Sequence, residues 1–249
     1  MLLYCLPHAG GSAAMYHAWV HQIQGDVEVI PLELPGRGSR FNEPLMVDLH
    51  KQVDDLFETI RGRDNSDGFA IFGYSMGSLL AYELALKLEE HMCPPKRVFL
   101  GAMGSPIKYR HRRTYDLPED DFIQEIDKLG GTPVELFMHR EMREIFIRIL
   151  RADFQLVETY SPDPCKRLTS TPLTVLYGDE DQAVVQCASA WSDLTLMGFS
   201  AFAYPGGHFF FREESSNLFN LVTAQLRADR CLAASSTQVS MSLTEGTRN

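Results

Sequence analysis

Short apolar runs alternate with stretches of helical periodicity along most of this chain. Six runs are nearly continuous in apolar residues, which is typical of parallel strands covered on both faces. They predict six strands, at residues 2–6, 27–32, 69–72, 97–103, 173–177 and 199–204.

Between these runs, apolar residues recur at the spacing of a helix. The pattern predicts helices at residues 14–24, 45–62, 76–91, 185–196 and 215–227. Strands that alternate with helices favour right-handed crossovers and a doubly wound sheet. We therefore expect an α/β fold whose mostly parallel central sheet carries helices on both faces.

One segment interrupts the alternation. Residues 115–164 show helical patterns, a break at residues 130–133 and no apolar run that predicts a strand. A helical insertion beside a site is typical of a lid, so we predict a lid here. The alternative is an ordinary pair of covering helices.

The two ends of the chain differ in pattern. Residues 1–232 predict one α/β domain, whereas residues 233–249 are rich in Ser and Thr and have almost no apolar periodicity. Such a composition predicts a disordered tail.

Composition excludes several classes of protein. The 249 residues carry a net charge of −10, which argues against general nucleic-acid binding. The five cysteines include no C-x-x-C pair, which favours a reducing compartment. No stretch reaches the roughly 18 apolar residues of a membrane span. We expect a cytoplasmic protein, with a monomer as the default.

A G-x-S-x-G motif lies directly between a predicted strand and a predicted helix. It reads Gly-Tyr-Ser-Met-Gly over residues 73–77. A serine on such a tight turn has a strained backbone and an exposed hydroxyl, as in the nucleophile elbow of α/β-hydrolases. Ser75 is the candidate nucleophile.

A serine hydroxyl needs a base and a group that orients the base. In hydrolases with this topology the order is Ser, acid, His, and among the histidines only His208 fits it. The loop after the fifth predicted strand offers three carboxylates, of which we choose Asp181, with Asp179 as the competitor. The same cluster could instead cap the following helix.

An oxyanion hole needs two backbone N–H donors. Met76 follows the nucleophile at the start of its helix and supplies the first. The Gly-rich loop at residues 7–12 follows the first strand, and Ala9 is our choice for the second donor. His8 in this loop could be a second base, but its ring is expected to pack and support the loop.

Together these motifs give the chain a family likeness. It resembles the type II thioesterases, the stand-alone editing hydrolases of polyketide and nonribosomal peptide synthetases. The likeness covers residues 2 to about 225 in five blocks: residues 7–12, residues 34–40, the elbow at 73–77, residues 129–133 with 151–154, and residues 206–210.

The resemblance implies hydrolysis of acyl thioesters on the phosphopantetheine arm of an acyl or peptidyl carrier protein. It supports Ser75 as nucleophile, His208 as base and Asp181 as orienting acid, and it implies that residues 115–164 form a mobile lid. It implies no cofactor and no metal.

Basic side chains gather after two predicted strands, where open α/β sheets place their sites. Carrier proteins are typically acidic, and their arm bears a phosphate, so we expect these residues to dock the carrier. The alternative is a solvated basic turn. The residues are Arg37, Arg40, Lys108, Arg110, Arg112 and Arg113.

Three other functions remain open. A carboxylesterase or lipase would use the same three side chains, and an acyltransferase or cyclase would need a chamber that excludes water. A non-catalytic carrier-binding module would need no intact site, which the residues at positions 75, 181 and 208 argue against.

Overall fold

The structure, a computed structural model, describes residues 1–22, 27–109, 112–130 and 140–245, with backbone alone after residue 231. Six strands form one parallel sheet in the order β2-β1-β3-β4-β5-β6. They are β1 (Leu2–Leu6), β2 (Glu28–Pro31), β3 (Phe69–Tyr74), β4 (Val98–Gly101), β5 (Leu173–Gly178) and β6 (Phe199–Tyr204). The predicted strands and the α/β fold are confirmed.

Seven α-helices connect and follow the strands in the described ranges. They are α1 (His17–His21), α2 (Leu49–Arg61), α3 (Met76–Glu90), α4 (Glu119–Lys128), α5 (Arg140–Thr159), α6 (Gln182–Val185) and α7 (Phe211–Glu245). The insertion contains α4 and α5 and no strand in its described part, as its pattern predicted, while residues 131–133 of the predicted break lie outside the described residues.

Two predicted helices are shorter than expected. A 3₁₀ helix, Ala13–Tyr16, precedes the five-residue α1, and residues 23 and 24 lie outside the described residues. The prediction at 185–196 was wrong in type, because α6 is a single turn and a 3₁₀ helix spans Ala188–Leu194. Ala188, Trp191 and Leu194 are buried at every third position, which fits the three residues per turn of a 3₁₀ helix.

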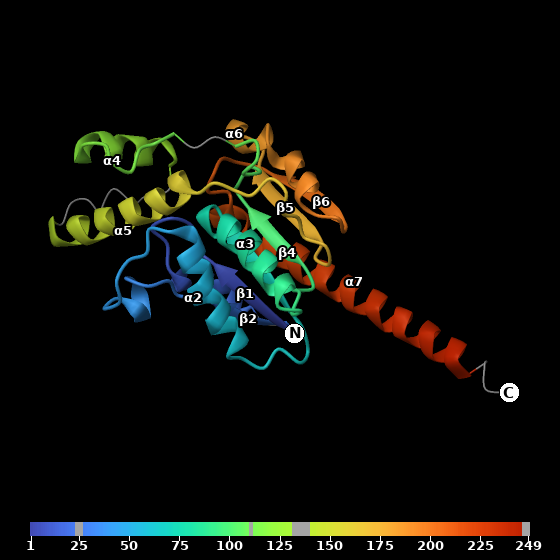
Figure 1. Cartoon of the computed structure of the whole chain (residues 1–249). Helices are drawn as coiled ribbons and strands as arrows, with labels where there is room; N and C mark the ends of the chain where they lie inside the picture. Colours follow the sequence, from blue (N-terminus) through green and yellow to red (C-terminus); the bar gives the residue numbers. More distant parts are fainter. Residues whose placement is uncertain (23–26, 110–111, 131–139, 246–249) are drawn as a thin grey trace.

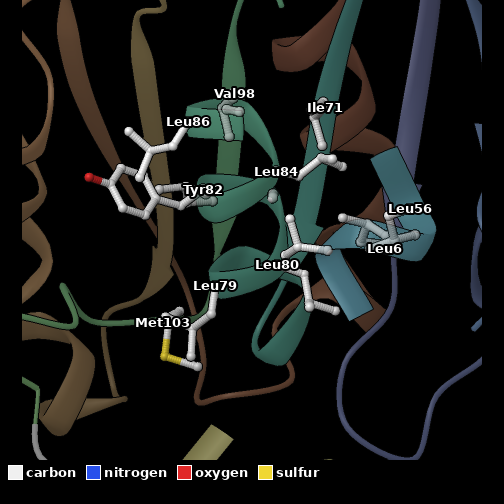
Figure 2. Packing of buried hydrophobic residues seen from close by; sticks show 14 of the residues in the cluster. Leu6, Leu56, Ile71, Leu79, Leu80, Tyr82, Leu84, Leu86, Val98 and Met103 are labelled. Atoms are coloured by element: carbon white, nitrogen blue, oxygen red, sulfur yellow. The ribbon is translucent and has the colours of Figure 1, made fainter. Parts of the chain in front are cut away.

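Both faces of the sheet are buried, because alternate residues of a strand point to opposite sides. In β3, Phe69 and Ile71 pack with α2 and α3, whereas Ala70 and Phe72 pack with α1 and α7. Figure 1 shows α2 and α3 on one side of the sheet and α7 on the other. Figure 2 shows leucines of α3 grouped against the strands.

Helix α2 shows how local sequence fixes an element. Asp48 caps its first turn by accepting a hydrogen bond from the Lys51 amide at 3.0 Å. Its buried positions recur at helical spacing and form one stripe against the core. They are Leu49, Gln52, Val53, Leu56, Phe57 and Ile60.

The chain changes direction across the sheet at β1. Strand β2 pairs with one edge of β1 and β3 with the other, so the loops after β1 and β3 diverge at a topological switch point. Leu6 at the end of β1 lies in register with Gly73. Loop 7–12 and the elbow therefore start side by side.

The predicted disorder of residues 233–249 differs from the structure. Helix α7 continues to Glu245, and Figure 1 shows its last part extending beyond the sheet and its other helices. Once the buried first part of a helix has formed, adding residues avoids the cost of nucleation, so a segment without apolar periodicity can continue it. Residues 246–249 lie outside the described residues.

None of the helices in the described ranges has the length and hydropathy to cross a bilayer.

Close packing between α3 and β1 makes Gly77 irreplaceable. A Cβ on Gly77 would lie 2.4 Å from the Leu6 carbonyl oxygen, a backbone atom that has no rotamer to escape into. We expect Gly77→Ala to lower the free energy of unfolding by about 3 kcal/mol or more. Urea denaturation followed by circular dichroism measures this change.

The matched control is Gly62→Ala at the end of α2. Gly62 has a φ of −72°. Its Cβ would first meet the Glu58 carbonyl oxygen at 3.4 Å, an ordinary contact. This variant should keep or slightly raise stability. Equal stability of both variants would contradict the packing argument.

Candidate active site

Ser75 lies on the predicted tight turn between β3 and α3. Its φ of 52° and ψ of −115° are rarely adopted by a residue with a side chain, and its amide donates to the Gly101 carbonyl at 2.7 Å. A Cβ on Gly73 would lie 2.1 Å from the Gly77 carbonyl oxygen. The two glycines let helix and strand approach closely enough to hold Ser75 in this conformation.

His208 reaches Ser75 from the loop after β6. Its Nε2 lies 2.9 Å from the Ser75 hydroxyl oxygen. The Tyr74 hydroxyl donates to the His208 carbonyl at 2.6 Å, which fixes the loop. A Cβ on Gly178 would lie 2.3 Å from the carbonyl oxygens of Gly206 and Gly207, so the end of β5 leaves room for this loop.

Asp181 is the carboxylate beside His208. Its Oδ2 lies 2.7 Å from His208 Nδ1, and both side chains are largely buried. Its other oxygen, Oδ1, accepts from the Val184 amide at 3.4 Å and caps α6. Asp179 instead accepts from the Gly206 amide at 3.1 Å and braces the histidine loop. One carboxylate thus orients the imidazole and caps the helix, and its competitor shapes the loop.

The expected oxyanion donors flank Ser75. Met76 is the first residue of α3, where the helix dipole adds to the field of its N–H. Ala9 lies in a turn that the Gly11 amide closes onto the His8 carbonyl at 2.9 Å. The Ala9 N–H takes no part in that closure, and Ala9 lines the same cavities as Ser75.

His8 supports this turn. Its Nδ1 lies 2.8 Å from the Ala9 carbonyl oxygen, and its ring packs edge-on against Phe209 with centroids 5.3 Å apart. Burial lowers the pKa of His8, so its ring is neutral at neutral pH. These contacts agree with a supporting ring and do not bring His8 into the chain of hydrogen bonds from Ser75 to Asp181.

Two cavities of about 80 and 60 Å³ adjoin the serine. The first extends from the residues just after β4 to Tyr109, Val157 and Glu158, and the second extends along α4 and α5 to Ile126, Phe146 and Leu150. Their linings are mostly apolar. Both share Ala9, Ser75, Leu129, Phe154 and His208. Residues of the insertion therefore form the wall opposite Ser75.

The structure contradicts the predicted docking role of Arg37. Its side chain is only 5% exposed and forms a bidentate ion pair with Asp153. The Arg40 guanidinium is also engaged within the protein, since it forms a bidentate ion pair with Asp55 and a further ion pair with Glu43. Local spacing did not predict these pairs, because Asp153 lies 116 residues from Arg37 and Asp55 lies 15 residues from Arg40.

The other basic residues lie on the surface where they are described. Arg112 pairs with Glu125 at 3.5 Å and Arg113 with Asp116 at 2.7 Å, and both guanidinium groups stay more than half exposed. Lys108 is exposed. Arg110 lies outside the described residues. This part of the basic cluster stays available to a partner.

Sequence reasoning missed two supporting residues, Tyr74 and Asp153. Burial raises the pKa of the Tyr74 hydroxyl, which stays protonated and donates to the His208 loop. Asp153 occupies an apolar stripe of α5, three residues after Leu150 and four before Val157. A lone carboxylate at such a position was the available signal, because a buried charge requires a partner.

No three His, Cys, Asp or Glu side chains in the described part of the chain lie close enough to hold a metal ion.

Comparison with known proteins relates this site to a family. The family model described as Thioesterase domain matches residues 2–226. The gramicidin S biosynthesis protein GrsT of Aneurinibacillus migulanus is 34% identical over 233 residues, which cover 90% of this chain and 88% of that protein. A "Probable cadicidin biosynthesis thioesterase" of Streptomyces griseus is 33% identical, and the match covers 93% of this chain but 64% of that protein.

A solved structure has the same fold. ClbQ from the colibactin NRPS/PKS pathway superimposes with a TM-score of 0.85 at 32% identity. The superposition covers 93% of this chain and 98% of that chain.

A comparison of variants at Asp181 and Asp179 tests this geometry directly. A fluorophosphonate probe reacts with a serine only where a base activates it. We expect Asp181→Asn to slow labelling of Ser75 at least 100-fold, because the imidazole loses its orienting partner. Asp179→Asn should slow it about tenfold or less, since it loosens only the loop. Mass spectrometry of the labelled serine peptide measures both rates.

Normal labelling of the Asp181 variant, with none in the Asp179 variant, would contradict this assignment and show that Asp179 orients the imidazole. Ser75→Ala provides the blank.

Proposed function

The chain belongs to the thioesterase family and is a hydrolase that acts on thioesters, and on that premise we propose that it is a stand-alone type II thioesterase. It unloads acyl groups from phosphopantetheinyl carrier proteins in polyketide or nonribosomal peptide biosynthesis. The observation that carries the proposal is the continuous contact from Asp181 through His208 to Ser75, beside a cavity walled by the insertion.

Acylation follows from this geometry. His208 Nε2 takes the Ser75 proton as the hydroxyl oxygen attacks the thioester carbonyl, and Asp181 stabilises the imidazolium that forms. The amides of Met76 and Ala9 hold the negative charge on the carbonyl oxygen. Collapse of the tetrahedral intermediate breaks the carbon–sulfur bond. The thiolate leaves readily without prior protonation, and it then takes the proton of the His208 imidazolium, so the carrier departs as a thiol and His208 is again a neutral base.

Deacylation repeats the step with water. His208 removes a proton from water as its oxygen attacks the acyl-serine carbonyl, and the collapse returns that proton to Ser75. The products are a free carboxylic acid, the carrier thiol and the regenerated serine. The side chains described supply every proton transfer that this sequence requires.

Residues 1–232 are the catalytic domain in this proposal, and residues 115–164 are its lid. Leu129 of the lid, with Phe154 and Val157 on α5, faces the cavity that contains Ser75. Movement of these residues would enlarge a space of about 80 Å³, which is too small for a long acyl chain. The enzyme works as a monomer and meets its carriers in the cytoplasm.

The substrate proposal is tested with two esters of one acyl group. We expect the protein to hydrolyse acyl-phosphopantetheinyl carrier protein faster than the matching oxygen ester by about 100-fold in kcat/KM. Ser75→Ala should lower kcat/KM for the thioester by about 10⁴-fold or more, because the nucleophile is lost. Release of the carrier thiol, followed by mass spectrometry of the carrier, measures the reaction.

A preference for the oxygen ester would favour a carboxylesterase. Transfer of the acyl group to an added alcohol or amine in place of water would favour an acyltransferase. Binding of the carrier without turnover would indicate a binding module.

The carrier docks, we propose, on the basic cluster of Lys108, Arg110, Arg112 and Arg113. Its described members, Lys108, Arg112 and Arg113, follow β4 in the chain, and the end of β4 lies beside the end of β3, at the edge of the sheet where Ser75 lies. The guanidinium groups of Arg112 and Arg113 remain more than half exposed despite their carboxylate partners. They can therefore meet the acidic surface and the phosphate of a carrier.

Charge reversal separates docking from catalysis. Arg112→Glu combined with Arg113→Glu should raise KM for the acyl carrier about tenfold and leave kcat unchanged, because only encounter is weakened. Hydrolysis of a small acyl thioester without the carrier should not change. Steady-state kinetics at two salt concentrations measures both.

The matched control is Arg61→Glu. Arg61 is also exposed and also pairs with a carboxylate three residues away, but it ends α2 at the opposite edge of the sheet. Arg61→Glu should leave KM and kcat unchanged for both the acyl carrier and the small thioester. An equal loss with carrier and small thioester in the double variant would contradict docking at this cluster.

A further inference from the structure

Arg37 and Asp153 form a buried ion pair between segments 116 residues apart. Arg37 follows β2, and Asp153 lies on α5 of the insertion. The two side chains are 5% and 2% exposed. Two hydrogen bonds of 2.6 Å join the guanidinium nitrogens to the two carboxylate oxygens. This geometry is the planar bidentate contact in which arginine binds a carboxylate most specifically.

Both members of the pair also bind the turn that contains Ala9. Asp153 Oδ2 accepts from the Gly10 amide at 2.7 Å. Arg37 Nη1 donates to the Gly11 carbonyl at 3.2 Å. The ion pair therefore fixes an N–H and a C=O of consecutive residues in the loop after β1.

The turn itself has little freedom to move against α5. Gly10 has a φ of +75°, and a Cβ at this position would lie 2.6 Å from Leu150 of α5. Both polar groups of the Ala9–Gly10 peptide have a partner. Its N–H donates to Asp153, and its carbonyl oxygen lies 2.8 Å from His8 Nδ1. The direction of this peptide plane limits where the preceding N–H, that of Ala9, can point.

We propose that Arg37 and Asp153 are positioning residues for the oxyanion hole. They hold the His8–Gly11 turn so that the Ala9 N–H faces the carbonyl oxygen of the substrate, and they tie that donor to the lid helix α5. The inference rests on the proposed function, because the oxyanion forms only when Ser75 attacks a carbonyl.

The energetics of burial support a role beyond stability. Arg37 Nε is buried without a hydrogen-bond partner in the described part of the chain, so the guanidinium is not fully satisfied. A buried ion pair is often matched or exceeded in stability by apolar side chains of similar volume. An apolar pair, however, offers no acceptor to the Gly10 amide. The carboxylate therefore supplies direction that an apolar contact lacks.

The same helix faces the substrate. Phe154 follows Asp153, and Phe154 and Val157 line the cavity that contains Ser75. An acyl group that contacts Phe154 therefore bears on the turn of α5 that also carries Asp153, the acceptor of the Gly10 N–H. Occupation of the cavity and alignment of the oxyanion donor are thereby coupled through one turn of α5.

The test uses a double variant, Arg37→Met with Asp153→Leu, which removes both buried charges together and so avoids leaving one unpaired. We expect kcat for a small acyl thioester to fall about 30-fold, less than the 10²-fold or greater loss of a complete oxyanion donor. KM should change less than about threefold, because the acyl cavity keeps its lining.

A second readout isolates the oxyanion. With an alkyl trifluoromethyl ketone, the Ser75 oxygen adds to the carbonyl carbon, His208 takes the hydroxyl proton, and the carbonyl oxygen becomes an oxyanion. Its inhibition constant should rise by about the same factor as kcat falls. The affinity of the carboxylic acid product, which forms no tetrahedral oxyanion, should stay within about twofold.

The matched control is another bidentate pair with little exposure, Arg97 with Asp229, which joins the residue before β4 to α7 through two 2.8 Å hydrogen bonds. Arg97→Met with Asp229→Leu alters a pair of the same kind away from the cavities. It should leave kcat and the inhibition constant unchanged.

An unchanged inhibition constant in the first double variant, or equal losses in both, would overturn the positioning role. The single variant Asp153→Asn provides a second measurement with the side-chain shape kept, and because its amide oxygen can still accept from the Gly10 amide, it should weaken the ketone less than the double variant does. Because ketone binding requires no turnover, it reads the oxyanion hole even if the wild type fails to hydrolyse thioesters, a result that would contradict the proposed function alone.

Discussion

The backbone at Ser75, with φ of 52° and ψ of −115°, costs about 1–3 kcal/mol relative to an ordinary conformation. The surrounding fold maintains it, since the Ser75 amide donates to Gly101 and the two flanking glycines admit close contact between β3, α3 and β1. In a relaxed conformation the hydroxyl would leave the carboxyl edge of the sheet. The 2.9 Å contact with His208 would then be lost.

Helix α5 is the second element on which the site depends. Glu158 accepts from the amides of Thr114 and Tyr115 at 2.7 and 3.0 Å, so α5 holds the start of the insertion. Asp153 holds the turn after β1, and Phe154 lines the cavity. The insertion is thus anchored along α5. Its described remainder, α4, packs on α5 through the small cluster of Phe122, Ile126, Ile147 and Leu150.

Prediction succeeded where a short segment contained its own explanation. Gly73 and Gly77 flank Ser75 between a strand and a helix, and the glycines before His208 mark a loop that can return to the sheet. The sequence left Asp179 as a competitor of Asp181, because both carboxylates lie on the same loop and satisfy the same pattern. Only the tertiary structure, in which Gly206 approaches the end of β5, shows that the Asp179 carboxylate accepts a hydrogen bond from the Gly206 amide.

The amino-acid pattern by itself determined the six parallel strands and the strained serine between strand and helix, since each is encoded within a few consecutive residues. Tertiary structure decided which carboxylate meets the imidazole, how far α7 extends, and whether a basic side chain is exposed. Arg37 shows the reason. Its environment is set by Asp153, which lies 116 residues away, and burial of a charge depends on contacts that no local spacing contains.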